Sequence, residues 1–75
     1  MNRQALQRDV QVRLEAIGFE TEFRTVAVAV LRHPGRPGLT VRLGVTHVAV
    51  ELDGQLVDRV PIEEFDARHL PEQPG

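Results

Sequence analysis

The chain has 75 residues and contains no serine, cysteine, tyrosine, tryptophan or lysine. These absences exclude a serine or cysteine nucleophile, a lysine Schiff base and a tyrosine acid, and with them most covalent catalysis. The net charge is -2, from 11 carboxylates and nine arginines. The chain therefore lacks the broad basic surface that drives nucleic-acid binding.

The length and the lack of cysteine indicate one small domain that is stabilised by packing alone. Its 75 residues lie near the lower limit for a self-sufficient hydrophobic core. Without cysteine there is neither a disulfide framework nor a thiolate metal site, which suits a reducing cytoplasm. No N-terminal run resembles a signal peptide, and no stretch is long enough to span a bilayer. The arginine-rich, lysine-free composition indicates a GC-rich bacterium or its phage.

Charge is distributed unevenly along the chain. Residues 23–50 contain four arginines, two histidines and no carboxylate, whereas seven carboxylates follow from Glu51 onward. This pattern predicts either separate basic and acidic binding surfaces or mutual neutralisation within the fold.

A helix is predicted from about Arg3 to Ile17. We expect Asn2 to cap its start, and Gly18 to end it in a left-handed conformation that folds Phe19 back onto the helix. Four apolar residues recur at helical spacing and are expected to form the buried stripe: Leu6, Val10, Leu14 and Ile17. Four polar residues are expected to face away from the core: Gln7, Arg8, Gln11 and Glu15.

Four strands are predicted after the helix, over residues 23–31, 39–43, 45–52 and 55–60. The segment 33–38 holds two prolines and two glycines and is expected to be a turn, because such residues cannot continue a strand ladder. Asp53-Gly54 predicts a type I′ hairpin turn. Pro61 is expected to begin a short helix through Phe65.

The expected fold is therefore α+β, with the order α-β-β-β-β-α and two layers. One N-terminal helix packs on a small antiparallel four-stranded sheet. Residues 1–68 form the single domain, and residues 69–75 are expected to be a disordered C-terminal tail.

The expected register of the first hairpin predicts one face that receives the helix and one face that binds a partner. The helix-facing set is Phe23, Ala27, Ala29, Leu31, Leu39, Val41 and Leu43. The opposite face has an apolar centre rimmed by arginines, which is typical of a protein-binding patch. Its centre and rim are Val26, Val28, Val30, Arg24, Arg32 and Arg42, with Thr40 among them. The alternative is that Ile62 and Phe65 of the C-terminal segment fold over this face.

His47 and Asp58 are the candidates for acid–base chemistry. The expected register makes them diagonal neighbours across the second hairpin, where a carboxylate would orient the imidazole ring. Such pairs are also common on plain sheet surfaces, and no nucleophile accompanies this one. The three histidines lack metal-ligand spacing, and no phosphate loop is present. We therefore predict no catalytic residue, no metal site and no cofactor.

A basic hairpin is the second candidate surface, and it suggests nucleic acid. Arg32, His33, Arg36 and Arg42 could reach into a groove or contact phosphates. All three phenylalanines have expected core roles, so no aromatic side chain is left on which bases could stack.

Part of the sequence resembles the HicA-type mRNA interferase toxins. The resemblance rests on the run from Leu14 to Glu20 (Leu-Glu-Ala-Ile-Gly-Phe-Glu), on Arg32-His33-Pro34 and on Leu39-Thr40-Val41, and it covers about residues 10–43. It implies a double-stranded-RNA-binding-like α-β-β-β-α scaffold. That family carries a catalytic histidine after Gly-Ser on the strand before the turn, where this chain has residues 26–30, Val-Ala-Val-Ala-Val. The resemblance therefore implies a scaffold without the RNase activity.

We expect a non-catalytic, cytoplasmic interaction module that binds a protein partner or a second copy of itself through the valine face. Small adaptors and inhibitors of phages or other mobile elements have this character, which is an analogy of fold. Nucleic-acid binding through the hairpin 32–42 is the alternative function, and an enzyme that uses His47 and Asp58 is the third.

Overall fold

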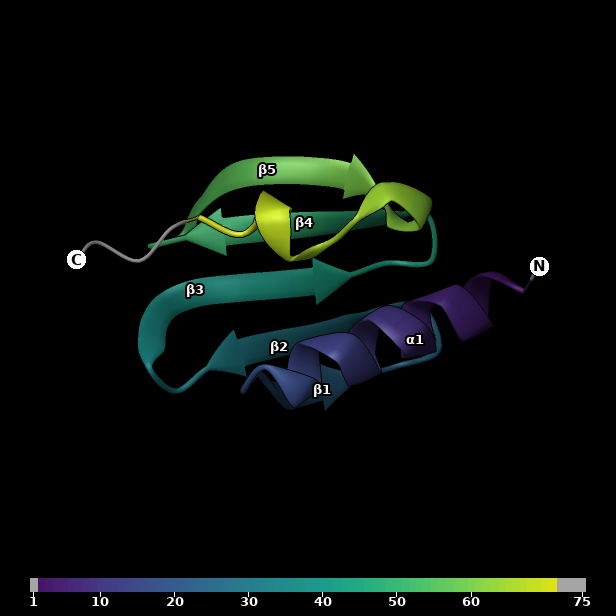
Figure 1. Ribbon diagram of the computed structural model, residues 1–75, viewed down its shortest axis with the longest axis horizontal. Helices are drawn as coiled ribbons and strands as arrows, with labels where there is room; N and C mark the ends of the chain where they lie inside the picture. The colour runs from purple at the N-terminus through teal and green to yellow at the C-terminus, as the bar shows by residue number, and fades with distance from the viewer. Residues whose placement is uncertain (1, 72–75) are drawn as a thin grey trace.

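The computed structural model describes residues 2–71. The strands pair in sequence order, each antiparallel to the next, so the sheet is an open meander (Figure 1). The fold is α+β as predicted, but the prediction of four strands is wrong, because the sheet has five. The elements are α1 (Arg3–Ala16), β1 (Glu20–Arg24), β2 (Ala29–His33), β3 (Arg36–Leu43), β4 (His47–Leu52), β5 (Gln55–Pro61) and the 3-10 helices η1 (Ile62–Glu64) and η2 (Ala67–His69).

The fifth strand arises because a turn divides the strand predicted over residues 23–31. Thr25 Oγ1 accepts hydrogen bonds from the backbone N–H groups of Ala27 and Val28. The Thr25 N–H donates to the Val28 carbonyl at 2.7 Å. Side-chain bonds of this kind compete with strand pairing, so β1 ends at Arg24 and β2 begins at Ala29.

α1 begins and ends where the sequence predicts. The Asn2 side chain accepts a hydrogen bond from the backbone N–H of Gln4. At the other end Gly18 has a φ of +104°, and the N–H of Phe19 donates to the carbonyl of Leu14 at 3.1 Å. This is the Schellman arrangement that the glycine predicts.

The buried side of α1 differs from the predicted stripe. The prediction that Gln7 and Gln11 face away from the core is wrong, since both are buried, whereas Ile17 is exposed. Gln7 Nε2 donates to the backbone oxygen of Leu43 at 2.8 Å, and Gln11 Nε2 donates to Thr21 Oγ1 at 2.8 Å. A buried amide is tolerated when it is hydrogen-bonded, so these two bonds set the rotation of the helix against the sheet.

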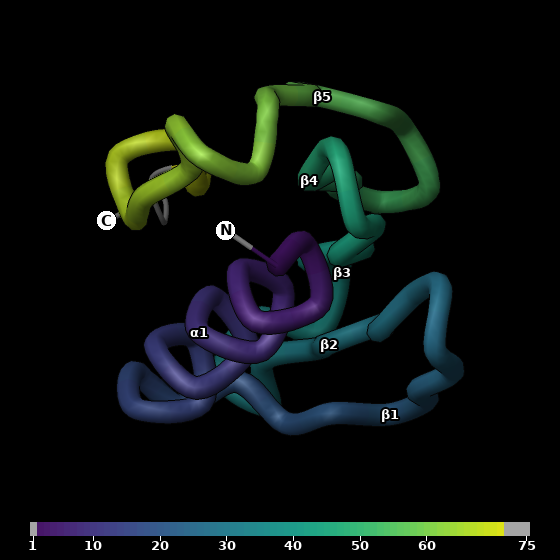
Figure 2. The backbone as a smooth tube through the Cα atoms, turned by 90° about the vertical axis from the view of Figure 1, so that its right-hand side faces the viewer, coloured from purple at the N-terminus to yellow at the C-terminus, as the bar shows by residue number. Residues whose placement is uncertain are grey.

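The sheet curves around α1, and the core fills its concave side (Figure 2). Ile62 and Phe65 of the C-terminal segment belong to this core, so they do not cover the opposite face of the sheet. The remaining buried apolar side chains of the core are Val10, Leu14, Phe19, Ala29, Leu31, Leu39, Val41, Leu43, Val48 and Val50.

Two β-bulges change which side chains face this core. One lies between Thr21 and Phe23, and it turns Phe23, which the sequence places on the helix side, to the convex face opposite Val30. The other lies at Val57 on β5, where the register shifts between Val50 and Glu51. Each extra residue reverses the side on which the following residues lie.

The turns agree with the sequence in position but not always in length. Asp53 and Gly54 have φ values of 52° and 83°, as the predicted type I′ turn requires. The turn predicted over 33–38 is shorter, because His33 already pairs with Arg36. Leu31 therefore pairs with Val41 rather than with Leu39.

The C-terminal segment continues beyond β5 as two short 3-10 turns. The predicted helix from Pro61 to Phe65 is the single turn η1. The predicted tail begins at His69, whose Nδ1 accepts the backbone N–H of Asp66 at 3.1 Å, and Leu70 packs against the core. The rest of that predicted tail, residues 72–75, lies outside the described residues. Among residues 2–71 no helix has the length and apolar content that crossing a membrane requires.

Candidate functional site

Among residues 2–71 no element covers the convex face of the sheet, because α1, η1 and η2 all lie on the concave side (Figure 2). The strand register aligns residues of this open face into two rows that cross all five strands. With about 4.8 Å between strands, each row is roughly 19 Å long. The Phe23 row consists of Phe23, Val30, Arg42, Ala49 and Arg59, and the Thr40 row consists of Glu20, Arg32, Thr40, Glu51 and Leu56.

The Phe23 row is apolar at one end and basic at the other. Phe23 is 54% exposed, although its neighbour Val30 is only 9% exposed. Arg42 forms an ion pair with Glu51 of the other row, with 3.2 Å between Nε and Oε1. Among residues 2–71, no carboxylate lies within 4.0 Å of Arg59. The row itself contains no acidic residue.

The Thr40 row carries residues of both charges, and three of its members (Arg32, Thr40 and Glu51) line a hollow of about 480 Å³. Arg32 pairs with Glu22 at 2.7 Å, and Arg42 and Glu51 lie on the same wall as Thr40. Exposed ion pairs of this kind contribute only about 0–1 kcal/mol.

The residues of the predicted valine patch do not lie on one face in the structure. Val30, Arg32 and Arg42 share the open face, but the β1–β2 turn removes Val26 and Val28 from the strand. Val26 is 79% exposed in that turn. Arg24 is paired with the core residue Ala29, so it lies on the concave side.

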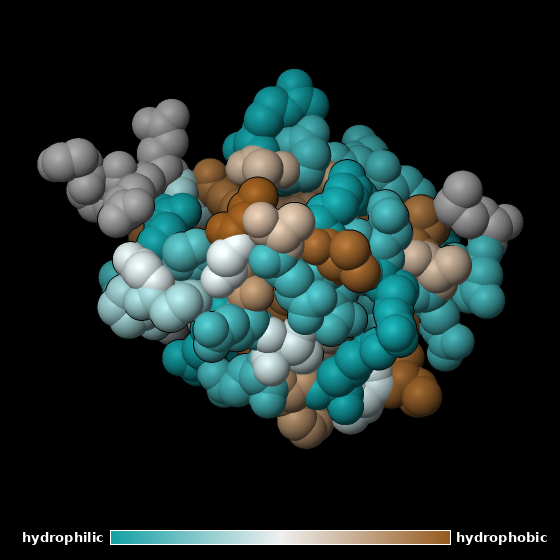
Figure 3. All heavy atoms as spheres, turned by 60° about the horizontal axis from the view of Figure 1, so that its bottom comes forward, coloured by the Kyte–Doolittle hydropathy of each residue, from teal (hydrophilic) through white to brown (hydrophobic). Residues whose placement is uncertain are grey.

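Three residues of the Phe23 row are absent from the predicted patch: Phe23, Ala49 and Arg59. Only the register reveals them, and the register depends on the two bulges. Exposed apolar side chains are also scattered. Figure 3 brings the lower side of Figure 1 forward, which is a different side from the open face, and there the apolar atoms lie in separate areas with hydrophilic atoms between them.

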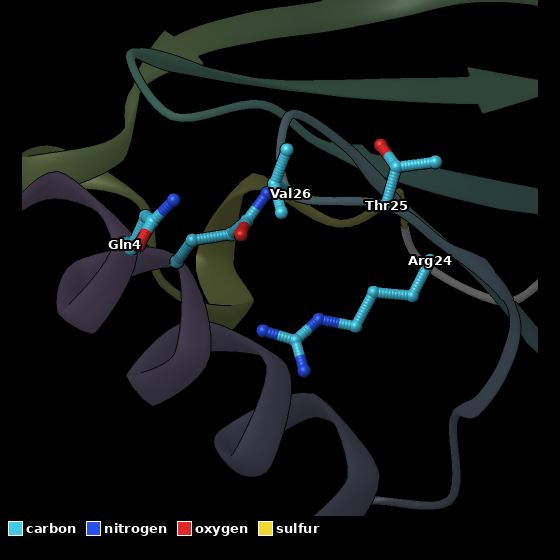
Figure 4. A pocket seen from close by; sticks show the side chains of 5 residues that line it. Gln4, Arg24, Thr25 and Val26 are labelled. Carbon is cyan, nitrogen blue, oxygen red and sulfur yellow. The ribbon is translucent and has the colours of Figure 1, made fainter.

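A second hollow, of about 420 Å³, lies between α1 and the β1–β2 turn. In Figure 4 the side chain of Arg24 extends from the end of β1 toward α1, and Val26 and Thr25 stand on the turn above it. In the described part of the chain no carboxylate lies within 4.0 Å of Arg24. The residues that line this hollow are Gln4, Gln7, Arg24, Thr25 and Val26.

The remaining residues of the predicted basic hairpin contact other parts of the chain. His33 Nε2 lies 3.1 Å from the backbone oxygen of Ile17, and its Nδ1 accepts the N–H of Gly35 at 3.1 Å. Arg36 is half-buried and donates from Nη2 to the carbonyl of Pro71. His33 and Arg36 thus hold the helix end and the C-terminal segment.

His47 and Asp58 do not form the predicted acid–base pair. His47 lies opposite Pro61, and Asp58 lies opposite Val50, so the bulge on β5 puts the two on different faces. Asp58 Oδ1 accepts the backbone N–H of Arg59 at 2.8 Å. No group of three His, Asp or Glu side chains that could hold a metal ion occurs in the described region.

The element order also differs from the α-β-β-β-α scaffold that the toxin resemblance implies, since five strands and two 3-10 turns follow α1. Comparisons with protein-family models, with curated proteins and with solved structures each find no match.

Proposed function

We propose that the protein is a non-catalytic module that binds another protein through the open face of its sheet. The observation that carries the proposal is the Phe23 row, which takes one residue from each strand and holds an exposed phenylalanine, two arginines and no carboxylate. Arginine and aromatic side chains are enriched at protein interfaces. This row replaces the predicted valine patch as the contact line.

The charge pattern of the row defines the partner. An apolar side chain of the partner would pack on Phe23 and Val30, and its carboxylates would pair with Arg42 and Arg59. These two arginines are two strands apart, roughly 10 Å, a distance that a short acidic segment can span. The partner is therefore an acidic, partly apolar protein surface.

The composition supports the wider setting of this proposal. The lack of cysteine supports a cytoplasmic location, and the arginine-rich, lysine-free sequence supports a bacterial or phage source. Nucleic-acid binding by the hairpin 32–42 has less support, because His33 and Arg36 serve contacts within the fold.

The proposal is tested with a displayed peptide library selected on the wild-type protein. We expect enrichment of peptides that combine apolar residues with Asp or Glu. These peptides should lose binding to Phe23→Glu and to Arg59→Glu. Val12→Glu is the matched control, because Val12 is 55% exposed on α1, away from the open face. Enriched peptides that bind all the variants equally would contradict the proposal.

Light scattering in low and high salt tests whether a second copy occupies the face. A dimer that Phe23→Glu dissociates would make a second copy the partner and would replace the proposal of an acidic protein. A monomer that binds the selected peptides supports it. Binding of single-stranded or duplex oligonucleotides with a steep salt dependence, lost in Arg42→Ala, would favour the alternative function.

A further inference from the structure

We infer that the hollow beside α1 is a carboxylate site that accepts the C-terminal residue of a peptide. This inference does not depend on the open face, since the hollow lies on the other side of the sheet between α1 and the β1–β2 turn. Its volume of about 420 Å³ falls in the range of small-molecule sites, about 300–1,000 Å³.

Arg24 supplies the group that would bind the carboxylate. It is the last residue of β1 and pairs with the core residue Ala29, and its side chain extends toward α1 (Figure 4). A guanidinium group binds a carboxylate through two parallel hydrogen bonds. Within residues 2–71 no acidic side chain occupies Arg24, so this capacity is unused.

Gln7 supplies a fixed acceptor on the wall of the same hollow. Only 1% of its surface is exposed, and its Nε2 is held by the carbonyl of Leu43 at 2.8 Å. That bond decides which end of the amide is the donor. In the described part of the chain no hydrogen bond uses Gln7 Oε1. A ligand that satisfies this oxygen must carry a hydrogen-bond donor, and a peptide has one, the backbone N–H, in the same residue as its terminal carboxylate.

Val26 adds an apolar contact at the mouth of the hollow. It is 79% exposed, yet its position is fixed, because Thr25 Oγ1 accepts the N–H groups of the two following residues. The C-terminal residue of a peptide carries a carboxylate, a backbone N–H and a side chain within one unit. These three groups can contact Arg24, Gln7 and Val26 respectively. A lone inorganic anion can contact only Arg24, because it has neither an N–H donor nor an apolar side chain.

The test is a titration of the intact protein with N-acetyl-leucine, followed by backbone amide NMR. N-acetyl-leucinamide is the control ligand, because it lacks only the carboxylate charge. We expect saturable shifts at Gln7, Thr25 and Val26 with a millimolar Kd for the acid and at least about tenfold weaker binding of the amide, since a charge-assisted bond is lost. Arg24→Gln should weaken binding of the acid by the same factor, whereas Arg8→Gln on α1 should leave it unchanged.

Three results would overturn the inference. They are the absence of saturable shifts, equal binding of the acid and the amide, and unchanged binding to Arg24→Gln whose amide spectrum shows it to be folded. Phe23→Glu separates this site from the proposed function: it should leave N-acetyl-leucine binding unchanged. Loss of that binding in Phe23→Glu would move the ligand to the open face and would also overturn the inference.

Discussion

His33 on β2 holds the end of α1, because its Nε2 lies 3.1 Å from the backbone oxygen of Ile17. Its other ring nitrogen accepts the N–H of Gly35, so the two partners assign the donor to Nε2. Phe19 packs edge-on against the ring, with 5.1 Å between centroids. The first hairpin thus satisfies a helix carbonyl that the helix itself leaves unpaired.

This contact makes Gly18 sensitive to substitution in two ways. Its φ is +104°, and an added Cβ would lie 2.7 Å from His33 Nε2. Gly54 has a φ of +83° with no atom within 4 Å of an added Cβ, so it isolates the cost of the backbone conformation. We expect Gly54→Ala to destabilise the fold by about 1 kcal/mol and Gly18→Ala by about 2 kcal/mol or more, measured by urea unfolding. The excess should disappear in a His33→Ala background, and an undiminished excess there would contradict the steric explanation.

Substitution of the two buried glutamines of α1 by leucine should change the stability of the fold by different amounts. Gln7→Leu removes the donor to the carbonyl of Leu43, and an unpaired buried acceptor costs about 1–3 kcal/mol. Gln11→Leu loses the bond to Thr21 but also removes an Oε1 that is fully buried without a partner. The Oε1 of Gln7 is not fully buried, so only Gln11→Leu has this offset, and its cost should stay within about 1 kcal/mol. Urea unfolding of the two variants gives the comparison. Equal losses would show that Gln7 is held by packing alone.

Asp66 should make the stability of the fold depend on pH in the acidic range. Hydrogen bonds from the Arg68 side chain and then its backbone N–H lower the pKa of Asp66 from 3.8 to about 2. The unfolded state therefore takes up this proton first, and the stabilisation, complete above pH about 4, is lost as pH falls toward about 2. We expect the difference in urea midpoint between wild type and Asp66→Asn to shrink over this interval. A difference that is constant with pH would rule out the linkage.

Glu63 acts in the same direction. A hydrogen bond from its own backbone N–H and then one from Arg3 lower the pKa of Glu63. The unfolding of the Asp66→Asn variant should therefore retain some acid sensitivity. Arg68→Gln serves as the matched variant, because it removes the side-chain donor to Asp66 and leaves Glu63 untouched. The pH dependence of its urea midpoint should lie between those of wild type and Asp66→Asn, because the backbone N–H of residue 68 still lowers the pKa of Asp66.

Alanine substitutions of Phe19 and Phe23 should differ in their effect on stability, because one side chain lies in the core and the other on the surface. Phe19 is 4% exposed and packs in the core, so Phe19→Ala should cost about 3–5 kcal/mol, which is most of the stability of a small domain. Phe23 stands on the open face, and Phe23→Ala should cost less than about 1 kcal/mol. Thermal unfolding measures both. A large loss in Phe23→Ala would mean that Phe23 serves the fold rather than a partner.

Local signals in the sequence predict the local structure well. Asn2, Gly18 and the pair Asp53-Gly54 each fix the backbone through their own chemistry, and each lies where it is predicted. The split at Thr25 also has a local cause, but the alternation of valine and alanine around it favours a continuous strand. The side-chain bonds of one threonine are enough to reverse that preference.

Which residues lie on which face of the sheet could not be predicted. Each bulge adds one residue to a strand, and the side chains after it then lie on the opposite face. The bulge after Thr21 moves Phe23 to the open face. The bulge at Val57 separates His47 from Asp58. The rotation of α1 depends on the hydrogen bond from Gln7 to the carbonyl of Leu43, 36 positions away in sequence. The spacing of apolar residues within the helix gives no information about such a long-range bond.

The meander also determines the order in which the chain can fold. All four strand pairings join neighbours in sequence, so each closes a short loop at low entropic cost. The contact between Arg3 of α1 and Glu63 of η1 instead joins positions 60 residues apart. During synthesis α1 precedes the five strands, and η1, which contacts α1, follows them. We therefore expect the hairpins to form early and the sealing of α1 to be the last step of folding.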